Sequence, residues 1–177
     1  MIGILSVDKN WRVSVNGAYV YKIKSSLKNF KEYTTNRVVV MDKEMIESLP
    51  KKQALKNRIN ICFTEEKSFS KEGFVVANSK DQLFELLGFY SSENVFLIGS
   101  GEFCKELLPY CEKFIISKFD GDVKCNNQFI DLDKEKNWKL ISTSNPFFED
   151  EIMFYTCEYK NICPKKYNYG YEREELI

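Results

Sequence analysis

Short apolar segments alternate with amphipathic segments along most of this 177-residue chain, and this alternation limits the possible folds more than any other feature. Residues 37–41 (RVVVM) and 94–98 (NVFLI) are typical of buried strands, and residues 24–34 place Leu27 and Phe30 at helical spacing. Strands that alternate with helices predict crossover connections and a mostly parallel sheet.

The last two predicted strands have no helix between them, which predicts an antiparallel edge. We therefore predict one α/β domain: a mostly parallel central sheet of about eight strands with an antiparallel C-terminal edge, and about four flanking helices. Strands are expected at residues 1–7, 37–41, 58–64, 74–77, 94–98, 113–119, 138–142 and 151–160, and helices at 24–34, 43–49, 81–88 and 102–108. The domain is placed at residues 1–160, and the charged, tyrosine-rich tail at 161–177 has no assigned role.

Opposite charges balance in this chain, with 26 Lys and Arg against 26 Asp and Glu. A chain without a basic surplus has no field to hold nucleic acid or an anionic membrane surface. The first residues lack a basic start, and no apolar run approaches membrane-spanning length. We therefore expect a cytoplasmic protein that binds neither nucleic acid nor membrane.

The chain has six cysteines and no histidine, which limits the chemistry it can perform. No CxxC pair occurs, so a zinc-site pattern is absent and free thiols are the expected state. Without histidine, Ser-His-Asp and Cys-His catalysis are excluded, and any proton transfer must use Asp, Glu, Lys, Tyr, Cys or water.

Residues 94–108 (NVFLIGSGEFCKELL) run from a buried strand through Gly99, Ser100 and Gly101 into a helix. Backbone amides at a helix start can receive an anion, and glycine lets a phosphate approach the backbone. A tight strand-to-helix turn without a ligand uses the same residues, so the motif alone leaves both interpretations open.

Six segments occur in the order and at the spacing of one known family: DKNWRVS, SLKNFKEYT, VVVMDKEMIESLP, LKNRINICFT, VFLIGSGEF and CNNQF. On these segments, residues 1–160 resemble the dihydrofolate reductases. The resemblance implies a sheet that holds a reduced nicotinamide against a pterin, with hydride transfer to C6 and protonation at N5. The implied reaction converts 7,8-dihydrofolate to tetrahydrofolate, with NADPH as cofactor, and we expect a monomer.

For the substrate, the resemblance implies a carboxylate-binding group and an apolar wall. Arg58 matches the arginine that binds the folate α-carboxylate, which a planar guanidinium can do through two parallel hydrogen bonds. Tyr21 stands where the family has a tryptophan beside the substrate, and Ser117 where a threonine fixes the catalytic acid. The other implied substrate contacts are Ile4, Leu5, Ser6, Leu27, Phe30, Leu49, Leu55 and Ile98. The apolar ones would also suit an ordinary core.

The family's catalytic carboxylate is replaced by Ser26 in this chain. A serine hydroxyl forms hydrogen bonds but carries no charge near neutral pH. We therefore expect either slower catalysis or a different proton route, through water or Tyr21, together with weak binding of cationic diaminopyrimidine antifolates.

The implied cofactor positions also depart from the family. Around the place of the NADPH 2′-phosphate stand Glu44, Glu65 and Glu102, and only Lys43 keeps a positive charge. Repulsion of the phosphate predicts that NADH is accepted comparably to NADPH. The implied cofactor-binding residues are Ser6, Val13, Ser14, Lys43, Met45, Thr64, Glu65, Gly99, Ser100, Gly101, Glu102 and Phe103.

Two alternatives stay open at this point. A non-catalytic relative that binds folate, a nucleotide or a protein would tolerate the same departures. A related pterin-type reductase, such as the reductase domain of riboflavin synthesis, has the same fold, although Arg58 favours a glutamate-bearing substrate.

Overall fold

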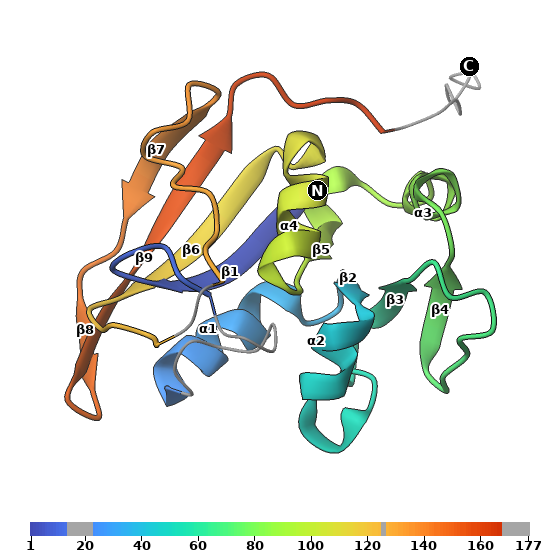
Figure 1. The fold of residues 1–177 in the computed structure, drawn as a ribbon, viewed down its shortest axis with the longest axis horizontal. Helices are drawn as coiled ribbons and strands as arrows, with labels where there is room; N and C mark the ends of the chain where they lie inside the picture. The colour runs from blue at the N-terminus through green and yellow to red at the C-terminus, as the bar shows by residue number, and fades with distance from the viewer. Residues whose placement is uncertain (14–22, 125–126, 168–177) are drawn as a thin grey trace.

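The computed structural model of the protein describes residues 1–13, 23–124 and 127–167 (Figure 1). In this part of the chain the strands are β1 (Ile2–Asp8), β2 (Val38–Asp42), β3 (Ile59–Phe63), β4 (Phe74–Ala77), β5 (Val95–Leu97), β6 (Lys113–Phe119), β7 (Trp138–Thr143), β8 (Phe147–Glu149) and β9 (Ile152–Asn161). The α-helices are α1 (Lys24–Thr34), α2 (Lys43–Ser48), α3 (Lys80–Leu87) and α4 (Gly101–Leu107). Single 3₁₀ turns are η1 (Pro50–Lys52), η2 (Ser92–Asn94) and η3 (Leu108–Tyr110).

All described strands belong to one sheet, in the order β4-β3-β2-β5-β1-β6-β9-β7, with β8 paired to β9. Strands β1 to β6 are parallel wherever they pair, whereas β9 is antiparallel to β6, β7 and β8. The predicted α/β fold, with a mostly parallel sheet and an antiparallel C-terminal edge, is confirmed. The described strands number nine against about eight expected, because the short β8 was missed.

Helices cover both faces of the sheet (Figure 1). On one face, Leu5 of β1 packs in a cluster with residues of α3 and α4, such as Leu83 and Phe103. On the other face, Ile4 packs in a cluster with Ile46 of α2 and residues of the neighbouring strands. This alternation along β1 follows from the two-residue period of a strand, and it leaves β1 buried from both sides.

The helix starts show where local prediction succeeds and where it fails. Serine is a favoured residue just before a helix, and Ser79 caps α3 because its hydroxyl accepts a hydrogen bond from the Gln82 amide at 3.2 Å. The sequence suggests Ser25 or Ser26 as the cap of α1, and this is wrong: the N-cap residue is Ile23, whose side chain forms no capping hydrogen bond. Glu149 of β8 instead accepts hydrogen bonds from the amides of Lys24 and Ser25 at 3.0 and 3.2 Å.

The beginning of the C-terminal tail packs onto the domain. The Lys165 amide donates to the carbonyl of Pro109 at 2.8 Å, and the buried Tyr167 ring lies 5.5 Å from that of Phe84. These contacts attach Lys165 and Tyr167 to the helices and turns that precede them in the chain. Among the described residues, every helix is too short or too polar to span a lipid bilayer.

Candidate active site

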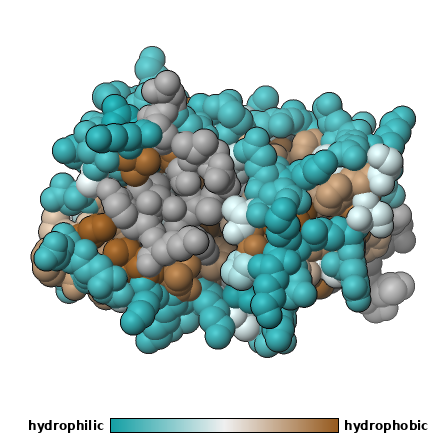
Figure 2. Space-filling model, turned by 60° about the horizontal axis from the view of Figure 1, so that its bottom comes forward, coloured by the Kyte–Doolittle hydropathy of each residue, from teal (hydrophilic) through white to brown (hydrophobic). Residues whose placement is uncertain are grey.

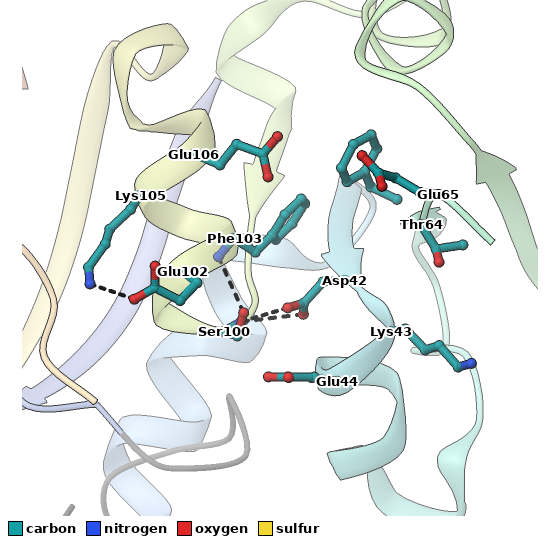
Figure 3. Close-up of a pocket in the computed structure, with 11 residues that line it drawn as sticks. Asp42, Lys43, Glu44, Thr64, Glu65, Ser100, Glu102, Phe103, Lys105 and Glu106 are labelled. Carbon is teal, nitrogen blue, oxygen red and sulfur yellow. Dashed lines mark hydrogen bonds and ion pairs between the residues drawn. The ribbon is translucent and has the colours of Figure 1, made fainter. Parts of the chain in front are cut away.

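The carboxyl ends of three parallel strands border a cleft of about 660 Å³, drawn in Figure 3. Asp42 ends β2, Phe63 ends β3, and Ser100 follows β5. Ligands of open parallel sheets bind at this edge of the sheet, because the loops after the strands converge there. The volume suits a drug-sized or nucleotide-sized molecule.

The floor of this cleft is aromatic. The buried Phe103 of α4 stacks on Phe63 with 5.7 Å between ring centroids and 17° between ring planes. Thr64 stands beside Phe63, and its carbonyl accepts a hydrogen bond from the Asn78 side chain at 2.8 Å. The floor therefore offers an apolar surface on which a flat ring can pack.

Asp42 lines the cleft, and its carboxylate connects the start of α2 with the turn before α4. Its carboxylate accepts a hydrogen bond from the Met45 amide at 3.1 Å, which caps α2. Both carboxylate oxygens also lie 3.3 Å from the Ser100 amide nitrogen. Two amides that could receive an anion are therefore already bound to a side chain of the protein itself.

The glycines of the strand-to-helix turn are required by close packing. A Cβ at Gly99 would lie 2.7 Å from the Phe103 ring and 3.0 Å from an Asp42 oxygen. A Cβ at Gly101 would lie 2.7 Å from a Val13 methyl group. Neighbouring side chains thus fill the space beside both glycines, which favours the tight-turn interpretation of this motif.

The predicted cofactor residues divide between the cleft and its surroundings. Lys43, Thr64, Glu65, Ser100, Glu102 and Phe103 line the cleft. Met45 is buried in the cluster beneath α2, and Val13 donates its amide to the Asn127 carbonyl at 2.9 Å. Ser14 lies outside the described residues, as does the predicted catalytic residue Tyr21.

Most residues of the predicted substrate wall lie together on one face of the sheet. Ile4, Phe30, Leu49, Leu55 and Ile98 belong to one apolar cluster, in which Ile4, Phe30 and Leu55 are partly buried. Leu27 of α1 is also partly buried. In Figure 2, hydrophobic patches lie within a mostly hydrophilic surface. Leu5 differs from the others, because its side chain packs on the opposite face of the sheet.

Arg58 stands at the edge of this apolar cluster, held by α1. Its Nε donates to the Thr34 hydroxyl at 2.9 Å, and its guanidinium lies 5.9 Å from the centre of the Phe30 ring. Two further donors reach the carbonyls of Lys56 and Lys31. Arg58 also lines a separate pocket of about 390 Å³. The spacing of Phe30 and Thr34 on one helix face thus orients a guanidinium beside a partly open apolar wall.

The remaining predicted catalytic residues are Ser26 on α1 and Ser117 on β6. Ser26 is 4% exposed and lies in the first helical turn. On the sheet, Ser6, Ser117 and Thr156 stand directly opposite one another on adjacent strands. The hydroxyl of Thr156 is buried and has no hydrogen-bond partner among the described residues. Ser6, Ser26, Ser117 and Thr156 each carry a hydroxyl group, and none of the four carries a carboxylate.

A sequence model of the dihydrofolate reductase family matches residues 1–162. The chain belongs to the dihydrofolate reductase family. The Bacillus subtilis (strain 168) dihydrofolate reductase is 24% identical over 158 residues, covering 85% of this chain and 91% of that protein. The Schistosoma mansoni dihydrofolate reductase is 29% identical over 175 residues, covering 88% and 93%.

A solved dihydrofolate reductase has the same fold. The Enterococcus faecalis enzyme, complexed with NADP(H) and RAB-propyl, superimposes with a TM-score of 0.75 at 23% identity and covers 90% of this chain and 95% of its own. The predicted family, fold and oxidoreductase class are therefore confirmed, in a family that reduces dihydrofolate with NADPH.

Three side chains that shape the cleft and the start of α1 were not predicted from the sequence. Asp42 is the last residue of β2 and the N-cap of α2, a helix-start pattern that could have identified it. Lys105 lies one helical turn after Glu102 and binds it at 2.6 Å. Glu149 lies more than a hundred residues from the helix that it caps, so no local signal could have revealed it.

Proposed function

We propose that this chain reduces 7,8-dihydrofolate to tetrahydrofolate at the apolar wall beside Arg58, with Ser26 at the position of the family's catalytic carboxylate. The observation that carries the proposal is Arg58, oriented by Thr34 over Phe30 at the edge of the apolar cluster. A guanidinium beside a half-open apolar wall suits a substrate with a flat ring and an acidic tail.

The roles of the site residues follow from their surroundings. Ile4, Phe30, Leu49, Leu55 and Ile98 pack against the rings, and Arg58 binds the tail carboxylate. A reduced nicotinamide, when bound, supplies the hydride that C6 accepts, and N5 takes a proton from water or a hydroxyl group. The aromatic floor of Phe63 and Phe103 fits the flat rings of a dinucleotide.

Ser26 leaves this site without the charge that would favour a protonated pterin. Ser26 is buried in the first turn of α1, and its hydroxyl is the only side-chain group that it offers to a proton donor or a cation. The proposal therefore includes slow proton delivery and weak binding of diaminopyrimidine cations, a form of antifolate resistance. We further propose that the protein is a cytoplasmic monomer and that its reaction is a step of one-carbon metabolism.

A purified chain tests the proposal directly. With dihydrofolate present, absorbance of NADPH or NADH at 340 nm should fall, and Arg58→Gln should raise KM for dihydrofolate about tenfold or more. The KM for a dihydropterin without the glutamate tail should stay unchanged. Arg37→Gln is the matched control, because Arg37 also precedes a strand but donates to Asn94. Equal effects of both variants on dihydrofolate would refute the role of Arg58.

A non-catalytic relative is the second candidate. The observation that favours it is the engagement of the Met45 and Ser100 amides by Asp42, together with the missing carboxylate at Ser26. Folate or a dinucleotide would raise the melting temperature of such a protein, but the protein would oxidise neither NADPH nor NADH. A measured turnover above that of the cofactor alone would exclude this candidate.

A further inference from the structure

The cleft at the ends of β2, β3 and β5 carries a surplus of negative charge. Its lining includes five carboxylates and two ammonium groups. The carboxylates are Asp42, Glu44, Glu65, Glu102 and Glu106, and the ammonium groups are Lys43 and Lys105. The chain as a whole has no net charge, so this surplus is local.

Both ammonium groups already have carboxylate partners. Lys43 binds Glu66 at 2.6 Å, and this hydrogen bond, with the charge of Glu66, raises the pKa of Lys43. Lys105 binds Glu102 at the same distance. Figure 3 shows both side chains pointing away from Asp42 and Ser100. Neither lysine offers an unpaired charge to a ligand in the cleft.

Asp42 also occupies two backbone amides beside the cleft. The amides of Met45 and Ser100 donate to Asp42. The space beside Gly99 is filled by Phe103 and Asp42. A ligand phosphate would therefore meet a carboxylate where a strand-to-helix turn would otherwise offer it donors.

NADPH differs from NADH by one phosphate, which carries about two negative charges at neutral pH. The residues of the cleft fit the rings of a dinucleotide but do not fit this additional phosphate. We propose that the cleft binds NADH at least as tightly as NADPH, an inference that rests on the proposed function. Glu65 and Glu44 are the residues that disfavour the 2′-phosphate.

Coulomb's law gives the size of the effect. One carboxylate about 8 Å from a doubly charged phosphate weakens binding about fourfold at 10 mM salt and about twofold at 0.1 M salt. Repulsion is screened by salt, so added salt should improve NADPH binding relative to NADH. A cleft that attracts the phosphate shows the opposite dependence.

Calorimetric titration of the full chain with NADH and NADPH, at 10 mM and 300 mM salt, tests the proposal without measuring activity. At 10 mM salt we expect the Kd for NADPH to equal or exceed the Kd for NADH. The ratio of the NADPH Kd to the NADH Kd should fall at 300 mM salt. Glu65→Gln should lower the ratio about fourfold at low salt. Glu93→Gln, which removes an exposed carboxylate outside the lining, should leave it unchanged.

Each other result is decisive. NADPH binding tenfold tighter than NADH, and weakening with salt, would overturn the inference and leave the proposed function standing. An unchanged ratio in Glu65→Gln would overturn the role of that carboxylate. Absence of binding by both dinucleotides would overturn the inference and the proposed function together.

Discussion

Replacing Ser26 by aspartate returns a carboxylate to the start of α1, and its consequences can be estimated from the surroundings. Ser26 is 4% exposed, so the new charge is largely desolvated. The first turn of α1 contains no acidic residue, and an acid there gains about 0.3–1 kcal/mol from the helix dipole. Burial costs more than this, so the ligand-free variant should lose about 1–3 kcal/mol of unfolding free energy.

The same carboxylate should strengthen binding of a cationic ligand. A buried charged hydrogen bond is worth about 2–5 kcal/mol, so a 2,4-diaminopyrimidine should bind Ser26→Asp at least about 30-fold more tightly than the parent chain. Turnover of dihydrofolate should also rise, by about 100-fold if the carboxylate assists proton delivery. Ser26→Asn is the control, since it has nearly the same shape as aspartate without the charge. Calorimetric affinities of the Asp and Asn variants that agree within threefold would show that position 26 does not face the ligand.

Three further predictions concern the frame of the site. Thr156→Val should leave stability unchanged or raise it by up to about 1 kcal/mol, because it removes a buried hydroxyl without a described partner; a clear loss in chemical denaturation would contradict this. The hydrogen bond from Ser25 lowers the pKa of Glu149. The ionised Glu149 carboxylate therefore stabilises the fold above the ordinary glutamate pKa, and this stabilisation is lost as the pH falls through the lowered pKa. Between about pH 5 and 3, the melting temperature of Glu149→Gln should fall less than that of the parent chain. Gly101→Ala should cost about 1–3 kcal/mol through contact with Val13, and Val13→Ala in the same chain should recover part of it; additive losses would refute the contact.

Local pattern was sufficient for much of the fold. The expected bounds of α1, β4 and β6 agree with the structure, because each is an apolar or amphipathic segment whose neighbours clearly break the period. The antiparallel pair of β7 and β9 was also predicted. The short β8 was not, since a three-residue strand exists only through its pairing with β9.

The site was less predictable than the fold. Its apolar wall could be proposed from resemblance, because residues such as Ile4 and Phe30 keep their type and spacing. The ion pair of Lys43 with Glu66 and the bond from Ser100 to Asp42 depend on how separate loops approach one another. Charge pairing of this kind decides what a cleft binds, and it follows from tertiary geometry that no single segment contains.

In the proposed reaction, a reduced nicotinamide and a pterin meet between the cleft of β2, β3 and β5 and the apolar wall beside Arg58. The test is incubation of the protein with dihydrofolate and a cofactor deuterated at the transferable position of the nicotinamide. We expect tetrahydrofolate with one deuterium at C6, detected by mass spectrometry and NMR. Oxidised cofactor without deuterium in the pterin, or unchanged dihydrofolate, would contradict it.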